Sequence, residues 1–469
     1  MHANASTVIY TPEIKAKPAE LDKMRRTLVL FPLPLQGHQT PMLLVANILY
    51  SKGFSISIIH THFNSPNPDS YPHFTFHPIS ESLLGCKAST ADVIGLLNTL
   101  NVNCVVPFRD ILGQILSENA AKEPVACLIT DAMWHFTQDI ADNLLLPRIV
   151  LRTSNPSSFV AFTYLSLFRE KGYLSAQGCQ LEEKVPELPP LKMKDIPILG
   201  TCDLEATYGL VCNMIEKTKS SRGLIFNSFE ELEGPALAML QQDFNIPLFA
   251  IGPFHKQAPS LSSSLLKQER DCISWLNAHA PKSVLYISFG SIAAVSEADF
   301  LEIAWGLANS KQPFLWAIRP GLVRGLDGPA PLPSGFLETT AKQGRIVTWA
   351  PQDEVLAHPA VGGFMTHSGW NSTLESICEG VPMLCLPCFG DQMVNARHVT
   401  DVWKVGLRFE NGLNRDDIEN SIRRVLVEKE GKEISQRLAY LKEKASLCLA
   451  SGGSSHKSLE ILVSHILSF

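Results

Sequence analysis

Residues 349–392 gather side chains that could bind a phosphorylated ligand. Residues 361–367 form a short apolar run, and the following SGWNSTLESICEG predicts a helix with Ser368 as its N-cap and Gly380 at its end. Such a strand-to-helix turn aims backbone N–H groups and the positive end of the helix at one point, which suits a diphosphate. Three polar side chains of the turn could bind the same group: His367, Asn371 and Ser372.

Other residues of this stretch could bind a base and two kinds of sugar. Trp349 ends the run RIVTW and could stack on a base, while Glu375, one helical turn beyond Asn371, could accept hydrogen bonds from a ribose. Asp391 and Gln392 offer the acceptors and donors that hexose hydroxyls need. Each feature alone has a common structural explanation, because a Gly-Ser turn often only caps a helix and a Trp at a strand end often belongs to the core. Their combination predicts a site for a nucleotide sugar.

Two strand ends in the first half of the chain could place an acid beside a base. TLVLFPLPL predicts a buried strand, followed by a helix with Thr40 as N-cap and Pro41 at its first position. His38 precedes that helix, in the kind of turn where open parallel sheets bind ligands, and the helix end favours a neutral imidazole. Residues 126–134 predict a second buried strand, which carries Asp131 near its end.

The pair of His38 and Asp131 has the chemistry of a general base. An aspartate bonded to one ring nitrogen would fix the tautomer and stabilise the imidazolium that forms when the other nitrogen takes a proton. A lone histidine in a turn is more often a solvated group. The pairing with Asp131 is therefore what indicates catalysis.

The elements around these residues fall into two α/β series. Apolar strands alternate with helical patterns up to PLFAIGPF, which predicts one parallel-sheet domain. A segment rich in Pro and Ser follows, and SVLYISFGS then begins a second series. We expect a disordered lead-in at 1–24, a first domain at 25–254, a linker at 255–268, a second domain at 269–445 and a final helix at 446–469.

Length and composition set outer limits on the protein class. A chain of 469 residues is too long for one compact core and fits two domains. Its net charge of -6 does not favour nucleic acid or an anionic membrane as a partner. The 11 cysteines follow no repeated spacing, and the C-x-x-C of Cys385 and Cys388 has no second ligand pair, so we expect no metal. Without a secretory signal or a run of roughly 20 apolar residues, we expect a cytoplasmic protein with reduced thiols.

These motifs resemble those of a known family. Residues 349–392 resemble, nearly position for position, the signature box of the plant secondary-product glycosyltransferases, the family-one enzymes that use UDP-sugars. The similarity extends over most of the chain from about Arg25 onward and points to UGT76-type glucosyltransferases, with one departure at Ser368, where many members have Cys. It implies an α/β fold of two facing Rossmann-like domains, the GT-B fold, with the active site in the interdomain cleft. It also implies that the final helix packs back on the first domain.

The resemblance assigns roles to the candidate residues. It implies inverting transfer of glucose from UDP-glucose to a hydroxyl or carboxyl group, with His38 as the base, Asp131 as its partner and no metal or cofactor. Gln392 at the end of the box implies glucose as the sugar. The residues that would bind the UDP-sugar are Ser291, Trp349, Ala350, Gln352, His367, Trp370, Asn371, Ser372, Glu375, Asp391 and Gln392.

The acceptor is defined by the sequence only in outline. The run 155–173 predicts a core helix that, by resemblance, also contributes to the acceptor pocket. An apolar pocket with few polar guides fits phenolics, flavonoids, terpenoids or hormone-like acids. The candidate acceptor residues are Phe136, Ser154, Phe159, Phe162 and Phe389. We expect a monomer whose partners are this small molecule and the UDP-sugar.

Other protein classes fit the sequence less well. A nicotinamide dehydrogenase or a sugar-nucleotide epimerase would have G-x-G-x-x-G after the first strand, where FPLPLQGHQ stands. An α/β hydrolase would have a G-x-S-x-G elbow, which the sequence lacks. A non-catalytic UDP-sugar-binding protein would keep residues 349–392 but would not need His38 and Asp131. That class, and a transferase for another UDP-sugar, stay as alternatives.

Overall fold

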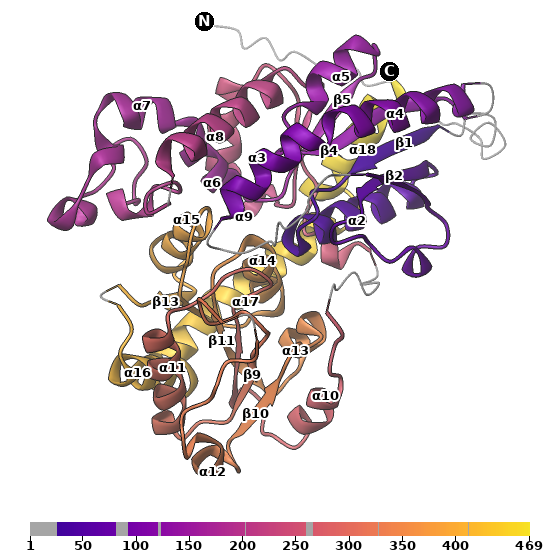
Figure 1. Cartoon of the computed structure of the whole chain (residues 1–469). Helices are drawn as coiled ribbons and strands as arrows, with labels where there is room; N and C mark the ends of the chain where they lie inside the picture. Colours follow the sequence, from indigo (N-terminus) through magenta and orange to yellow (C-terminus); the bar gives the residue numbers. More distant parts are fainter. Residues whose placement is uncertain are drawn as a thin grey trace, which may run out of the picture.

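Two parallel β-sheets, each covered by helices, make up the chain (Figure 1). The computed structural model describes residues 26–80, 92–120, 123–201, 203–258, 266–326, 328–410 and 412–469. The first sheet has 7 strands in the order β3-β2-β1-β4-β5-β6-β7, and the second has 6 in the order β10-β9-β8-β11-β12-β13. This is the predicted pair of Rossmann-like domains. The expected lead-in at 1–24 and residues 259–265 of the expected linker lie outside the described residues.

The first domain alternates strands and helices along the chain. Its strands are β1 (Thr27–Phe31), β2 (Ser55–Thr61), β3 (Thr75–Ile79), β4 (Val125–Asp131), β5 (Arg148–Arg152), β6 (Leu224–Phe226) and β7 (Leu248–Ala250). Its helices are α2 (Gln36–Ser51), α3 (Val93–Asn103), α4 (Val105–Asn119), α5 (Thr137–Asn143), α6 (Pro156–Thr163), α7 (Leu165–Glu170), α8 (Leu204–Lys219) and α9 (Glu230–Asp243). Each strand pairs in parallel with its neighbour, so all strand ends that could carry ligands lie at one edge.

The second domain repeats this alternation. Its strands are β8 (Val284–Ser288), β9 (Phe314–Ala317), β10 (Gly344–Val347), β11 (Val361–Thr366), β12 (Met383–Cys385) and β13 (Gly406–Arg408). Its helices are α10 (Asp271–Leu276), α11 (Glu297–Ser310), α12 (Phe336–Thr340), α13 (Gln352–Ala357), α14 (Trp370–Glu379), α15 (Gln392–Arg397), α16 (Arg415–Leu426) and α17 (Lys429–Leu449). Of the helices in the described ranges, none is long and apolar enough to cross a lipid bilayer.

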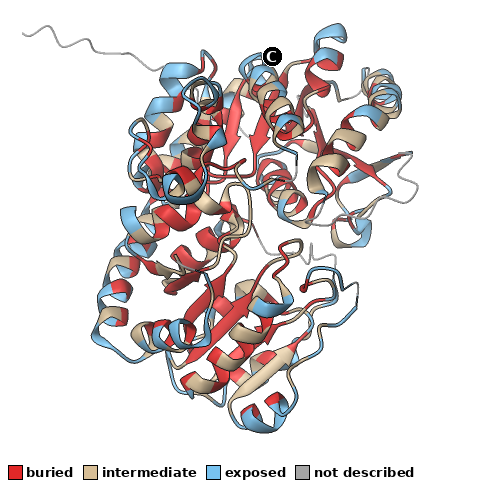
Figure 2. Cartoon of the chain, turned by 60° about the vertical axis from the view of Figure 1, so that its left-hand side comes forward, coloured by how far each residue is buried: buried red, intermediate tan, exposed pale blue. Residues whose placement is uncertain are grey.

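The central strands are buried on both faces, as their uninterrupted apolar runs predict. In β1 all 5 residues are buried, and successive side chains enter different cores: Val29 and Phe31 join one apolar cluster, while Leu28 and Leu30 join another. Figure 2 shows these buried strands between helices whose outer faces are exposed. Burial of this kind fixes the sheets rigidly, so the loops at the strand ends are held in place.

The last helix, α18 (Ser454–Leu467), returns the chain to the first domain. Its residues Leu459, Leu462 and Ile466 belong to the same apolar cluster as Leu28 of β1, whereas Ile434 of α17 belongs to a core of the second domain. In Figure 1 the two yellow helices run from one domain to the other. The change of direction lies at 450–453, inside the segment 446–469 that the sequence predicted as one final helix. Residues 446–449 of that segment form the last turn of α17.

Helix α2 begins earlier than the sequence predicted. Thr40 and Pro41 were expected at its start, but the helix begins at Gln36, so both residues lie inside it. Pro41 has no N–H and cannot bond the carbonyl of Gly37 four residues before it. The side-chain amide of Asn371, from the second domain, donates to that carbonyl instead, at 2.9 Å. Thr40 therefore does not cap the helix, and the carbonyl that Pro41 leaves without a helical partner is bonded by a tertiary contact.

A buried ion-pair cluster also joins the domains. Asp195, in a short 3₁₀ turn of the first domain (Met193–Asp195), is fully buried. Its carboxylate accepts from Arg397 Nε at 2.8 Å and from Arg408 Nη1 at 2.6 Å, both in the second domain. Arg397 also pairs with Glu410 at 2.9 Å. Because water cannot screen charges at a buried site, the arginines depend on this carboxylate for neutralisation.

We predict that Asp195→Asn destabilises the protein strongly. The substitution preserves shape but leaves buried arginine charge without its main partner, which costs about 3–5 kcal/mol in other proteins. The midpoint of urea unfolding should fall accordingly. Asp139→Asn is the matched control, because its pair with Lys217 is exposed (63% for Asp139) and should change the midpoint little. Equal midpoints for Asp195→Asn and the unmodified protein would contradict the stabilising role of the cluster.

Candidate active site

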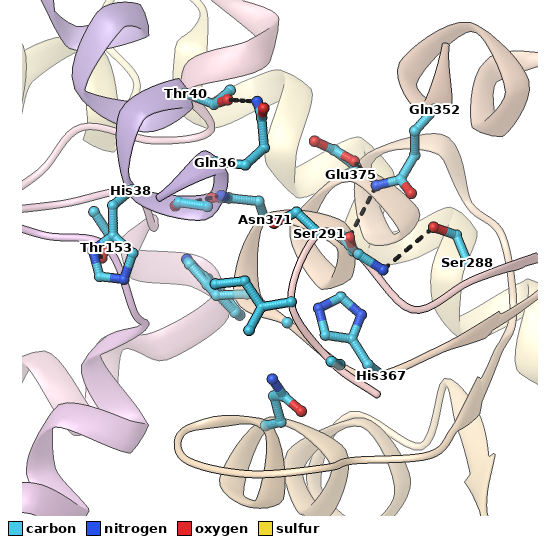
Figure 3. A pocket seen from close by; sticks show the side chains of 18 of the residues that line it. Gln36, His38, Thr40, Thr153, Ser288, Ser291, Gln352, His367, Asn371 and Glu375 are labelled. Atoms are coloured by element: carbon cyan, nitrogen blue, oxygen red, sulfur yellow. Dashed lines mark hydrogen bonds between the residues drawn. The ribbon is translucent and has the colours of Figure 1, made fainter. Parts of the chain in front are cut away.

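A cavity of about 300 Å³ lies between the two domains, at the carboxyl ends of both sheets. The first domain contributes the start of α2 and the residues that follow β5, and the second contributes the turns after β8 and β11. Figure 3 shows His38 and Thr153 on one side, with His367, Gln352 and Glu375 on the other. Ligands of open α/β sheets bind at this edge, so the cavity is the candidate active site.

His38 and Asp131 meet at the wall formed by the first domain. His38 lies in the first turn of α2, and Asp131 is the last residue of β4, which pairs with β1. His38 Nδ1 is 2.7 Å from Asp131 Oδ2, and the other carboxylate oxygen accepts from the Met133 N–H at 2.9 Å. Asp131 is fully buried, whereas the His38 side chain keeps 26% of its surface exposed. The contact that the two strand ends predicted is present.

The hydrogen bonds of His38 fix which nitrogen can react. Thr153, which follows β5, places Oγ1 3.0 Å from the same Nδ1 atom. A carboxylate at 2.7 Å requires a proton on Nδ1, so the unprotonated nitrogen of the neutral ring is Nε2. Because Nδ1 is occupied and His38 lines the cavity, Nε2 is the atom able to take a proton from a ligand. Thr153 was not among the residues predicted from the sequence, although it directly follows β5, the strand next to β4.

His367 lies close to the backbone in the turn between β11 and α14. A Cβ on Gly369 would come within 2.4 Å of His367 Nε2, and a Cβ on Gly290 would come within 2.7 Å of Cε1. A side chain at either position would therefore force the ring of His367 to move. Burial, together with the nearby charge of Arg319, lowers the pKa of His367 to about 4, so the ring is neutral at pH 7. Its buried Nδ1 has no hydrogen-bond partner among the described residues.

The start of α14 corrects the predicted cap. Ser368 was expected as N-cap, but the helix begins at Trp370 with Gly369 in the cap position, and Ser368 adopts a left-handed backbone with φ of 64°. A Cβ at residue 369 would displace the ring of His367, which favours glycine in the cap position. Gly380 ends the helix in a left-handed conformation, as predicted. The first turn of α14 leaves N–H groups without helical partners, and residues 369–372 of this turn line the cavity.

The first residue of α13 contacts α14 beside the cavity. Gln352 Nε2 donates to Ser372 Oγ at 2.9 Å and to Glu375 Oε2 at 2.7 Å. Burial raises the pKa of Glu375 to about 7, and the amide of Gln352 offsets part of that shift. Trp370 uses its indole N–H on the carbonyl of Asn227 in the first domain, at 2.7 Å. That N–H is therefore not available to a sugar.

The end of the stretch forms a second polar wall. Gln392 Oε1 accepts from the backbone N–H groups of Cys388 at 2.9 Å and Phe389 at 3.2 Å, which turns its NH₂ group the other way. Asp391 Oδ2 accepts from Asn395 at 3.1 Å, and burial raises the pKa of Asp391. The predicted UDP-sugar residues all line the cavity: Ser291, Trp349, Ala350, Gln352, His367, Trp370, Asn371, Ser372, Glu375, Asp391 and Gln392.

The candidate acceptor residues divide into two groups. Ser154 and Phe389 line the cavity. Phe136 packs edge-on to Trp134, with ring centroids 5.7 Å apart, and Phe159 and Phe162 are buried on α6. These three phenylalanines do not line the cavity. The run 155–173, expected as one core helix, forms α6 and α7 with a break at Tyr164. Its buried side chains belong to the core, as the residue pattern predicted, and do not line the cavity.

Two buried arginines near the cavity were missed in the sequence. Arg319 donates to the carbonyls of Gly290 at 2.8 Å and Ala293 at 2.5 Å, so it holds the turn that carries Ser291. Its charge lies near His367 and adds to the positive potential there. Arg152 is the last residue of β5 and lines the cavity itself. For Arg152 the available signal was a charged residue at the end of an apolar strand, and Arg319 follows the end of β9 by two residues.

Comparisons with known proteins all indicate the same family. The model of the family described as "UDP-glucoronosyl and UDP-glucosyl transferase" matches residues 264–446. UDP-glycosyltransferase 76B1 of Arabidopsis thaliana is 51% identical, over 96% of this chain and 100% of its own length. UDP-glycosyltransferase 76G1 of Stevia rebaudiana is 47% identical, over 95% and 98%. The solved structure of a UDP-glucose: anthocyanidin 3-O-glucosyltransferase in complex with UDP has a TM-score of 0.82 and 26% identity, covering 95% of this chain and 100% of that one.

We predict that Glu375→Gln stabilises the protein at high pH. A carboxyl group whose pKa is raised to about 7 in the folded state binds a proton more tightly there than in the unfolded state, so its contribution falls as pH rises from about 4.5 to 7. Glutamine removes that penalty and keeps an oxygen for Gln352. Thermal unfolding should show a gain of up to about 3 kcal/mol at pH 8 that disappears at pH 4.5.

Glu354→Gln provides the control for this measurement. Glu354 lies on the same short helix as Gln352, but it is exposed (41%) and pairs with Arg270 at the surface. Its substitution should give no gain at pH 8. A gain for Glu375→Gln that is the same at pH 4.5 and pH 8 would show that burial of the charge is not the cause.

Proposed function

Because the chain belongs to the UDP-glycosyltransferases and is similar to their plant UGT76 members, we propose that it transfers glucose from UDP-glucose with inversion, giving a β-glucoside. As a member of this family, the chain is a UDP-glucosyltransferase that acts on small plant metabolites. The acceptor in our proposal is a small, largely apolar molecule that offers a hydroxyl or carboxyl group. The single observation that carries the proposal is the position of His38, anchored by Asp131 and facing the wall built by residues 349–392.

The proposed step is a displacement at the anomeric carbon. His38 Nε2 takes the proton of the acceptor hydroxyl while the acceptor oxygen forms a bond to that carbon. The bond from the carbon to the UDP oxygen breaks on the opposite face, and UDP leaves with the electron pair. Asp131 stabilises the imidazolium through Nδ1. Base assistance of this kind is typically worth about 10²- to 10⁴-fold in rate.

The residues of the second domain would hold the donor. In our proposal Trp349 stacks on uracil, Gln352 and Glu375 bind uracil and ribose, and the diphosphate lies at His367 and the start of α14. The orphaned Nδ1 of His367 supports this placement, because a buried ring nitrogen without a partner fits a polar ligand group. Negative charge that develops on the leaving diphosphate would be stabilised by the helix end, without a further cofactor. The glucose hydroxyls would meet Asp391 and the NH₂ group of Gln392.

The names of related proteins support glucose as the donor sugar. One relative of Arabidopsis thaliana is called flavonol 3-O-glucosyltransferase UGT76E12 and is 42% identical over 97% of this chain and 98% of its own length. Gln392 at the end of the stretch is the feature of this sequence that favours glucose. Rates with UDP-glucose, UDP-galactose and UDP-glucuronic acid would test that preference directly.

We predict that His38→Ala abolishes most transfer while UDP still binds. The imidazole removes the acceptor proton, so turnover should fall by about 10²- to 10⁴-fold. Calorimetric titration should give an affinity for UDP close to that of the unmodified protein, because His38 lies on the acceptor side. His358→Ala serves as the control, since His358 bonds Asn277 away from the cavity and should keep full turnover. Full activity of His38→Ala would refute the assignment of the base.

We predict that Trp349→Ala weakens UDP binding. Loss of stacking on a base costs about 1–3 kcal/mol in nucleic-acid complexes, which corresponds to roughly 5- to 150-fold in affinity. Trp349→Phe should recover part of that loss, because a smaller ring still offers a flat face. The measurement is calorimetric titration with UDP. If Trp349→Ala binds UDP as well as the unmodified protein does, the base lies elsewhere.

A further inference from the structure

A buried arginine at the wall of the cavity has few oxygen partners. Arg152 is 6% exposed and lines the cavity beside Thr153 and Ser154. Its Nε donates to Ser154 Oγ at 2.8 Å, and its Nη1 contacts the sulfur atoms of Met133 at 3.5 Å and Met214 at 3.2 Å. A thioether sulfur is a weak acceptor, and an arginine has five N–H donors. Most of the donor capacity of this side chain is therefore unused.

No carboxylate in the described part of the chain forms an ion pair with Arg152. Desolvation lowers the pKa of Arg152, and the charges of Asp131 and Asp391 act on it only from beyond ion-pair distance. The ring faces of Phe159 and Phe162 lie 5.5 and 5.2 Å from its Cζ atom and offset part of the cost of burial. A buried cation normally has a close counter-charge, so this one lacks a partner.

Arg148 shows how the same fold satisfies a buried arginine that has only a structural role. It lies at the start of β5, is 1% exposed and does not line the cavity. Its guanidinium donates to four oxygen atoms, those of Thr130 Oγ1, Gln138 Oε1, the Lys217 carbonyl and the Trp134 carbonyl. Arg148 and Arg152 lie on one strand, but only Arg148 has its donors bonded mainly to protein oxygens. This contrast indicates that the unused donors of Arg152 bind a ligand group in the cavity.

We propose that Arg152 binds a carboxylate of the acceptor, so that the preferred acceptors are small hydroxy acids with an apolar body. This inference rests on the proposed function. A carboxylate has the charge and the paired oxygens that match the guanidinium fork. Arg152 is followed directly by Thr153, which contacts His38 at 3.0 Å, so the bound acid and the base share one end of the cavity. The hydroxyl that reacts therefore lies near the carboxylate in the same small molecule.

The proposed arrangement predicts which product the enzyme forms. The carboxylate stays on Arg152 and does not react, while the hydroxyl loses its proton to His38 and gains the glucosyl group. The product is an O-glucoside, which survives mild alkali, and not a glucose ester, which mild alkali cleaves. A competing role for Arg152 is to act on Asp391 across the cavity, in which case donor binding would depend on it.

The test uses 2-, 3- and 4-hydroxybenzoate, each with its methyl ester, as acceptors with UDP-glucose. The position of the hydroxyl varies the span between the two groups, and the ester removes only the charge. We expect the unmodified enzyme to prefer the acid over its ester by at least about tenfold in kcat/KM for one isomer or more. Arg152→Met should lower that ratio by about 10- to 100-fold, and Arg152→Lys should retain part of it. Arg148→Met is the matched control and should keep the ratio of the unmodified enzyme.

Several outcomes would overturn the inference. An acid-to-ester ratio near one for all three isomers in the unmodified enzyme does so without any variant. A rise of the KM for UDP-glucose in Arg152→Met, with an unchanged acid-to-ester ratio, would also overturn the inference. It would assign Arg152 to donor binding through Asp391. Calorimetric titration of the hydroxybenzoates onto the enzyme with UDP separates the two proposals. Binding of the acids but not the esters, with no transfer to any acceptor, would support the carboxylate site and refute the proposed function alone.

Discussion

The apposition of two sheet edges is the constraint on which the site depends. Neither domain forms the cavity alone, because the base lies after β1 and the polar wall lies after β8 and β11. Polar contacts hold the edges together: the Trp370 indole on the Asn227 carbonyl and the Asn371 amide on the Gly37 carbonyl lie beside the cavity. The buried ion pairs of Asp195 with Arg397 and Arg408 also join the two domains. The relative position of His38 and residues 349–392 therefore follows from interactions made by other residues.

Sequence patterns predicted the parts of the structure that depend on local chemistry. Continuous apolar runs predicted the buried strands, and the rule that parallel strand ends share an edge predicted the contact between His38 and Asp131. The motif in residues 349–392 predicted which side chains line the second wall. Cap signals were less reliable. Thr40 lies inside α2, where the Gly37 carbonyl bonds Asn371 of the other domain. Ser368 precedes α14, where the ring of His367 lies close to residue 369 and favours glycine in the cap position.

The residues on the acceptor side of the cavity could not be predicted from the sequence, for a different reason. Apolar periodicity identifies the buried face of a helix, but it does not distinguish a face buried by protein from one that would be buried by a ligand. Phe159 and Phe162 satisfy the pattern and lie in the core, whereas Arg152 breaks the pattern and lines the cavity. What distinguishes Arg152 is a deficit of oxygen partners, and that deficit is visible only once residues from separate segments of the chain have been placed around it.

The proline in α2 has an effect that reaches into the opposite domain. Pro41 deprives the Gly37 carbonyl of its helical partner, and Asn371 supplies a hydrogen in its place. This hydrogen bond fixes the orientation of the Asn371 side-chain amide. Its nitrogen faces the first domain, and its oxygen is turned away from that domain. A residue with an amide hydrogen at position 41 would return the carbonyl to its own helix and let this amide rotate. One absent hydrogen in the lobe that carries the base thus dictates how a side chain is presented in the lobe that would hold the nucleotide.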